Sequence, residues 1–178
     1  SIDGVTPAWL QSVFQHAGLD MPRVSMASAV PIGHGNLSAT SRVAITYNAN
    51  AAEAVTSVVC KLTPTHAQTV QQAADAGVHG REVAVYQLFG AQPPLNVPRA
   101  YLAQVSEDQR TLNLVMEDLT GRTRSGDQIA GCSAEDARAV VEQFARLHAT
   151  FWEAPSLADA PWLLNRKSGA AGAAQSYA

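Results

Sequence analysis

Five segments of the chain show strand patterns, either an alternation of apolar and polar residues or a run of β-branched residues. They are residues 24–32, 42–47, 55–62, 99–105 and 110–116. Because the first three are joined by short connections, we expect them to form an antiparallel meander. The last two flank a polar turn and predict a β-hairpin.

Apolar residues with helical spacing predict three amphipathic helices. They occupy residues 7–17, 81–89 and 134–152. The Gln- and Ala-rich residues 67–76 are compatible with either a helix or a surface loop. Gly77 and Gly80 follow, and we expect them to interrupt any continuous helix at this point.

These elements predict an α+β fold whose main unit is a five-stranded antiparallel sheet with one inserted helix. We expect this unit over residues 24–118, preceded by an N-terminal helical extension over residues 1–23. A polar, glycine-containing linker over residues 119–133 follows. Residues 134–178 then begin a helical layer and end in a low-complexity tail with few large apolar side chains.

The composition narrows the class of protein. An apolar share of 47% and a net charge of −3 are typical of a globular protein without a general basic field, so we expect no nucleic-acid or membrane partner. No stretch has the length of a membrane span, and the first residues lack the pattern of a signal peptide. The two cysteines, Cys60 and Cys132, have no metal-ligand spacing. We therefore expect a cytoplasmic protein without a metal site formed by this chain.

A turn of small residues joins the first two predicted strands at residues 33–38. Gly33 and Gly35 adopt positive φ at no steric cost, and Asn36 tolerates it. Such a turn leaves its backbone N–H groups uncovered, which allows them to bind an anion such as a nucleotide phosphate. An ordinary β-hairpin has the same residues at its turn, so both interpretations stay open from this stretch alone.

Lys61 lies near the end of the most β-branched strand, on the same face as Val59. If that face is covered, the charge needs an anionic partner to offset its desolvation. If Lys61 lies at an edge, the side chain reaches water instead. Glu82, near the start of the second predicted helix, is either that partner or a solvated charge favoured by the helix dipole.

The order of these elements resembles the N-terminal lobe of the protein-kinase-like fold, followed by the first helix of an otherwise missing helical C-terminal lobe. More narrowly, the chain resembles the aminoglycoside phosphotransferase family, in its ecdysteroid-kinase-like and choline-kinase-like branch. The segments that carry the resemblance are residues 33–38, 59–61, 82–86, 114–119, 126–133 and 145–152. They occur in the order of the family and together span most of the range 25–152.

The resemblance implies a nucleotide site for ATP or GTP with Mg²⁺. In such a site a glycine turn lies over the phosphates. A lysine reaches the α- and β-phosphates and is held there by a glutamate. The strand residue two positions before the lysine covers the adenine. The backbone after the fifth strand reads the edge of the base. The implied site residues here are Gly33, His34, Gly35, Asn36, Ser38, Val59, Lys61, Glu82, Met116, Glu117 and Leu119.

The resemblance also implies a catalytic loop of the H-G-D type, which belongs to the C-terminal lobe of such enzymes. The closest stretch, Ser125-Gly126-Asp127-Gln128, has no preceding histidine and lies in the linker, so we assign no catalytic base. We expect the nucleotide-binding half of a phosphotransferase that acts on the hydroxyl or amine of a small molecule, with this chain alone inactive. The alternative is a kinase-like module that binds a nucleotide or a partner without catalysis.

Overall fold

The computed structural model describes residues 1–33, 37–49, 52–90, 92–124, 126–127, 129–158 and 160–163. Three residues of the predicted glycine turn, His34, Gly35 and Asn36, lie outside the described residues. So do residues 164–178 of the predicted low-complexity tail, and Ser125 and Gln128 of the linker.

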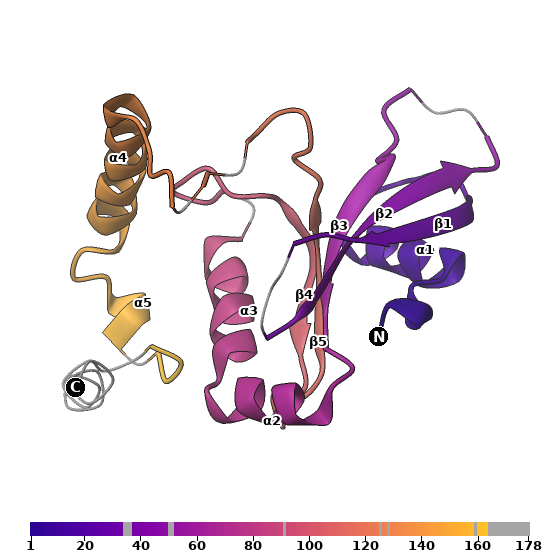
Figure 1. Ribbon diagram of the computed structural model, residues 1–178, viewed down its shortest axis with the longest axis horizontal. Helices are drawn as coiled ribbons and strands as arrows, with labels where there is room; N and C mark the ends of the chain where they lie inside the picture. Colours follow the sequence, from indigo (N-terminus) through magenta and orange to yellow (C-terminus); the bar gives the residue numbers. More distant parts are fainter. Residues whose placement is uncertain are drawn as a thin grey trace.

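The centre of the fold is a five-stranded antiparallel sheet (Figure 1). Its strands are β1 (Val24–Pro31), β2 (Ala39–Tyr47), β3 (Ser57–Leu62), β4 (Ala100–Val105) and β5 (Leu112–Glu117). Their order in the sheet is β1-β2-β3-β5-β4, and every neighbouring pair is antiparallel. The predicted α+β class, the meander of the first three strands and the terminal hairpin are therefore confirmed. Because β5 lies next to β3, the chain leaves the sheet from its interior and not from its edge.

One face of the sheet packs against an N-terminal helix, α1 (Pro7–His16), which follows the short 3-10 helix η1 (Ile2–Gly4). Thr6 caps α1, with its hydroxyl accepting a hydrogen bond from the backbone N–H of Trp9 at 3.2 Å. Leu10, Val13 and Phe14 are buried against apolar residues of all five strands. This helix and the sheet thus share one hydrophobic core.

The other face of the sheet is covered by helices inserted between β3 and β4, namely α2 (Ala67–Asp75) and α3 (Val78–Phe89). Residues 67–75, which the pattern left undecided, are helical. Gly77 separates the two helices with a left-handed φ of 59°. Two helices, not one, are therefore inserted into the sheet.

The prediction that Gly80 interrupts a helix was wrong, because Gly80 lies inside α3. A Cβ atom at this position would meet the end of the Gln109 side chain, in the turn between β4 and β5, and that flexible side chain can move. A single glycine weakens a helix without ending it, so the backbone hydrogen bonds of α3 continue through this residue.

Beyond the sheet the chain passes through a linker into α4 (Ala134–Phe151) and the short α5 (Pro155–Ala158). Ser133 and Asp136 form a capping box at the start of α4. Figure 1 shows α4 beside α3, on the side away from the sheet, and the rings of Phe89 and Phe151 stack at 6.2 Å between these helices. Among the described residues, no helix combines the length and the hydropathy that crossing a bilayer requires.

Candidate functional site

The structure brings Lys61 and Glu82 together on the face of the sheet that α3 covers. Nζ of Lys61 lies 2.8 Å from Oε1 and 2.7 Å from Oε2 of Glu82, so the ammonium group donates to both carboxylate oxygens. The side chains are 27% and 31% exposed, respectively. Of the interpretations that the sequence left open, the paired one is therefore observed, and the pair retains access to solvent.

A row of residues from four strands lies beside this ion pair. Val30 faces Arg42, Arg42 faces Val59, and Val59 faces Met116 in the strand registers. Directly paired residues share a face, and Val59 shares its face with Lys61 two residues later. Val30 is 61% exposed and Val59 is partly exposed. The ion pair thus borders a surface that is open to solvent and is apolar except for Arg42.

One face of α3 connects three parts of this region. Glu82 holds Lys61 of β3, and the hydroxyl of Tyr86 lies 3.1 Å from Sδ of Met116 in β5. Three residues before Glu82, Nε2 of His79 lies 2.9 Å from the carbonyl oxygen of Leu37. The sequence prediction missed His79, although the i, i+3 spacing from Glu82 places both residues on one helix face.

The phenol of Tyr86 lies near the carboxylate of Glu82, one turn earlier on α3. Burial raises the pKa of this phenol, and the negative charge of Glu82 raises it further. The hydroxyl therefore stays protonated and serves as a donor toward Met116 at physiological pH. Tyr86 thereby ties α3 to the strand from which the chain leaves the sheet.

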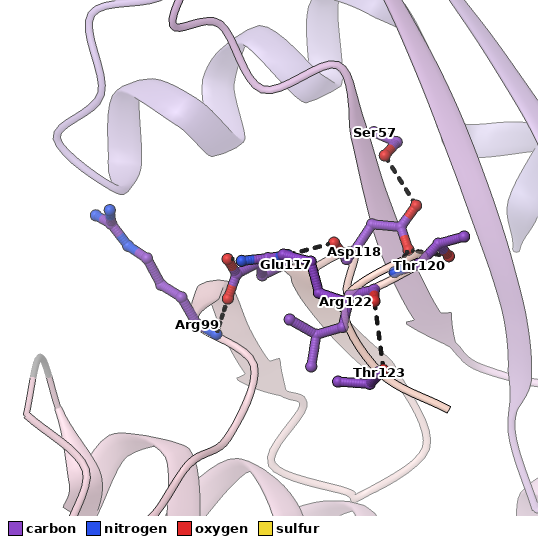
Figure 2. A network of polar contacts seen from close by, with 8 residues as sticks. Ser57, Arg99, Glu117, Asp118, Thr120, Arg122 and Thr123 are labelled. Atoms are coloured by element: carbon purple, nitrogen blue, oxygen red, sulfur yellow. Dashed lines mark hydrogen bonds and ion pairs between the residues drawn. The ribbon is translucent and has the colours of Figure 1, made fainter. Parts of the chain in front are cut away.

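That exit is the segment of residues 117–123, here called the hinge segment, and it is organised by Asp118 (Figure 2). Its carboxylate accepts hydrogen bonds from Oγ of Ser57 at 2.8 Å and from the backbone N–H and hydroxyl of Thr120 at 3.0 and 2.6 Å. Nε of Arg42 lies 3.0 Å from Oδ2 in an ion pair, and Arg42 also donates to the hydroxyl of Thr120. The Asp118 side chain is only 6% exposed.

Two opposing effects act on the ionisation of Asp118. Burial by itself raises the pKa, but the hydrogen bonds from Thr120 and Ser57 and the positive charge of Arg42 together hold it below its ordinary value. The carboxylate is therefore ionised in the folded protein and fastens the hinge segment to β2 and β3. The sequence prediction missed this cluster, because nothing in the local pattern links residues so far apart.

The neighbouring Glu117 is also held in place. Its carboxylate accepts a hydrogen bond from Arg122 at 2.7 Å and one from the backbone N–H of Arg99 at 3.3 Å. The hydrogen bond from Arg122 is the main reason why the pKa of Glu117 is lowered. The carbonyl of Leu119 accepts hydrogen bonds from the backbone N–H groups of Arg122 and Thr123. Contacts within the hinge segment therefore already use part of the backbone that the resemblance assigns to base recognition.

The predicted glycine turn is described only at its ends. Gly33 has a φ of 73°, a left-handed conformation that glycine adopts without strain. The backbone N–H of Ile32 donates to the carbonyl of Thr40 at 2.9 Å and closes the base of the turn. Ser38 lies directly before β2 and is partly buried. The described ends are therefore compatible with either a phosphate-binding turn or a plain hairpin.

A magnesium ion held by a protein needs several oxygen ligands gathered at one place. Nowhere in the described residues do three or more His, Cys, Asp or Glu side chains gather as a group that could hold a metal ion. The Glu82 carboxylate is already neutralised by Lys61. This part of the chain therefore offers no fit for a magnesium ion bound by protein ligands alone.

Taken together, the sheet, its inserted helices and the following helix have the architecture of a kinase N-terminal lobe. The chain belongs to the ecdysteroid kinase-like family, whose model matches residues 33–151. This is a family of small-molecule kinases within the aminoglycoside-phosphotransferase and choline-kinase-like group, as the resemblance indicated. Comparison with curated proteins and with solved structures finds no match. Family membership implies a kinase-like phosphotransferase that uses a nucleotide.

Proposed function

We propose that this chain is the nucleotide-binding half of an ATP- or GTP-dependent phosphotransferase whose acceptor is the hydroxyl or amine of a small molecule. The observation that carries the proposal is the half-buried Lys61–Glu82 pair beside a solvent-exposed row on one face of the sheet, which is apolar except for Arg42. A cation next to an apolar surface matches the two ends of a nucleotide, because the phosphates are anionic and the base stacks on apolar groups.

In this proposal the chain positions the nucleotide and neutralises its charge, which are the main contributions of a protein to phosphoryl transfer. Lys61 donates to oxygens of the α- and β-phosphates, and Glu82 holds the ammonium group at that place. Val59 and Met116 cover the base, and the backbone of Glu117 and Leu119 meets its polar edge.

The remaining parts of the proposal come from the glycine turn and from outside this chain. Gly33, His34, Gly35, Asn36 and Ser38 cover the phosphates with their backbone N–H groups. Magnesium enters bound to the nucleotide phosphates, which supply ligands that no cluster of three or more His, Cys, Asp or Glu side chains supplies among the described residues. We assign no catalytic base and no acceptor site to the described residues.

The first test is nucleotide binding by the chain. Isothermal titration calorimetry with Mg-ATP and Mg-GTP is carried out on the wild type and on the variant Lys61→Ala. We expect binding to weaken at least tenfold in the variant, because a hydrogen bond to a charged group contributes about 1.5–3 kcal/mol. The matched control is Arg110→Ala, whose side chain pairs with Asp108 in the turn before β5 and donates to Gln71 of α2.

Three outcomes decide the proposal. A wild-type chain that binds neither nucleotide contradicts it, and so does a Lys61→Ala variant that binds as well as the wild type. The third outcome is measured on a full-length protein that contains this chain. If the Lys61→Ala variant of that protein transfers the γ-phosphoryl group as fast as the wild type, the proposed role of Lys61 is wrong. If the full-length protein binds a nucleotide but transfers no phosphoryl group to a panel of hydroxylated and amino-bearing acceptors, the result supports the alternative, a module that binds without catalysis.

A further inference from the structure

His79 combines deep burial with an incomplete set of hydrogen bonds. Its side chain is only 2% exposed, and Nε2 lies 2.9 Å from the carbonyl oxygen of Leu37. Nδ1 is also buried, and it has no hydrogen-bond partner within the part of the chain that the structure describes. This combination is unusual, because buried polar atoms in folded proteins are nearly always paired.

The carbonyl fixes the role of one ring nitrogen. A carbonyl oxygen only accepts, so Nε2 carries a proton, and in the neutral tautomer with that proton Nδ1 is an acceptor. A buried acceptor without a donor is destabilising, and an apolar side chain of similar volume would avoid that penalty. Stability alone therefore favours another residue at position 79, whereas the hydrogen bond to Leu37 requires a donor there.

This hydrogen bond joins two parts of the proposed site, the face of α3 that carries Glu82 and the backbone that enters β2. His79 precedes Glu82 by three residues on α3, so both side chains project from the same helix face. Leu37 lies two residues before the start of β2, and Thr40 of β2 pairs directly with Lys61 of β3. One turn of α3 thus contacts both the entry to β2 and, through Glu82, the ammonium group of Lys61.

We propose that His79 is a positioning residue, which fixes the backbone that enters β2 relative to Lys61. This inference rests on the proposed nucleotide site. The backbone entering β2 and the ammonium group of Lys61 must contact the same phosphates, and a shift of about 1 Å between such groups is enough to weaken their joint action strongly. The His79–Leu37 hydrogen bond maintains this spacing through a rigid helix turn.

The test compares variants that remove the donor with one that keeps it. His79→Phe retains a ring but removes both the hydrogen bond and the unpaired nitrogen, and His79→Gln retains an N–H donor at a similar reach. For His79→Phe we expect Mg-ATP binding about five- to tenfold weaker by calorimetry, the effect of one hydrogen bond. For His79→Gln we expect affinity within about threefold of the wild type.

Two further measurements separate positioning from a structural role. The thermal midpoint of His79→Phe is expected to stay close to that of the wild type, because the lost hydrogen bond is offset by removal of the unpaired nitrogen. Backbone amide exchange in residues 37–40, without nucleotide, is expected to become faster in His79→Phe than in His79→Gln. A purely structural role predicts the reverse, a lower midpoint with unchanged affinity.

Each outcome has a defined meaning. If the wild type binds no nucleotide, the proposed function fails and this inference fails with it. If the wild type binds and His79→Phe binds equally well, only the positioning role is overturned. Equal weakening in His79→Phe and His79→Gln also overturns it. His79→Met is a second variant without the donor, and if both it and His79→Phe fail to fold while His79→Gln folds, the role is structural and the inference is wrong.

Discussion

The two faces of the sheet are built on different principles. The face toward α1 is closed and apolar, with Leu10, Val13 and Phe14 buried against the strands. The face toward α3 holds the Lys61–Glu82 pair, the buried His79 and a surface that α3 leaves uncovered around Val30. The apolar cluster that packs α3 on the strands, around Val83, is small, and polar contacts from Glu82 and Tyr86 add to it.

This difference separates stability from function within one sheet. Because side chains alternate along a strand, neighbouring residues of β3 serve opposite purposes. Val58 and Cys60 belong to the closed core, whereas Val59 and Lys61 face the open side. The burial of one face supports the fold, so the other face tolerates charged groups and solvent access that a core would not.

The strongest test of the closed face is Phe14→Ala. Phe14 is fully buried and meets the ring of Tyr101 edge-on at 5.9 Å. We expect the free energy of unfolding to fall by roughly 3–5 kcal/mol, measured by urea denaturation. Nucleotide affinity of the folded fraction is expected to stay unchanged. A small loss of stability together with weaker binding would show that the two faces are not independent.

The hinge segment is fastened to the open face, and Asp118→Asn tests that attachment. We expect a loss of about 2 kcal/mol in unfolding free energy, because a largely buried carboxylate loses its ion pair with Arg42 and its charged hydrogen bonds. The control is Asp20→Asn, an exposed carboxylate in the connection between α1 and β1, which is expected to leave stability unchanged.

The same pair of variants predicts a dependence on pH. The pKa of Asp118 is lowered in the folded protein, so its contribution is present above the pKa of the unfolded chain and is lost as the pH falls through the folded value. Stability of the wild type should therefore decline on acidification below about pH 4, and Asp118→Asn should decline less steeply. Parallel pH profiles would contradict the assignment.

The smallest expected effect concerns the two thiols. Burial in the α1-side core raises the pKa of Cys60 to about 12, whereas Cys132 is exposed in the linker. With a disulfide reagent at neutral pH, we expect Cys60 to react at least about a hundredfold more slowly than Cys132, because the thiolate is the reactive form. Cys132→Ser should abolish the fast phase. Rapid reaction of Cys60 would show that the closed face opens readily.

Local patterns were sufficient for most of the fold. Period-two alternation located the five strands, and short connections predicted their antiparallel pairing, since both depend on nearby residues. The capping residues Thr6 and Ser133 marked the starts of α1 and α4 for the same reason. Gly80 shows the limit of such patterns: it lies inside α3, because one glycine lowers helix propensity without ending a helix that packs on the sheet.

For the candidate site, the sequence by itself determined which residue types lie on each strand and helix face, and the order of segments indicated the kinase family. It left open whether Lys61 pairs with Glu82 or reaches water. It gave no sign of the Asp118 cluster or of the His79–Leu37 hydrogen bond. Only the tertiary structure decided these features, because ion pairs and hydrogen bonds across the sheet depend on distances that folding creates between remote residues.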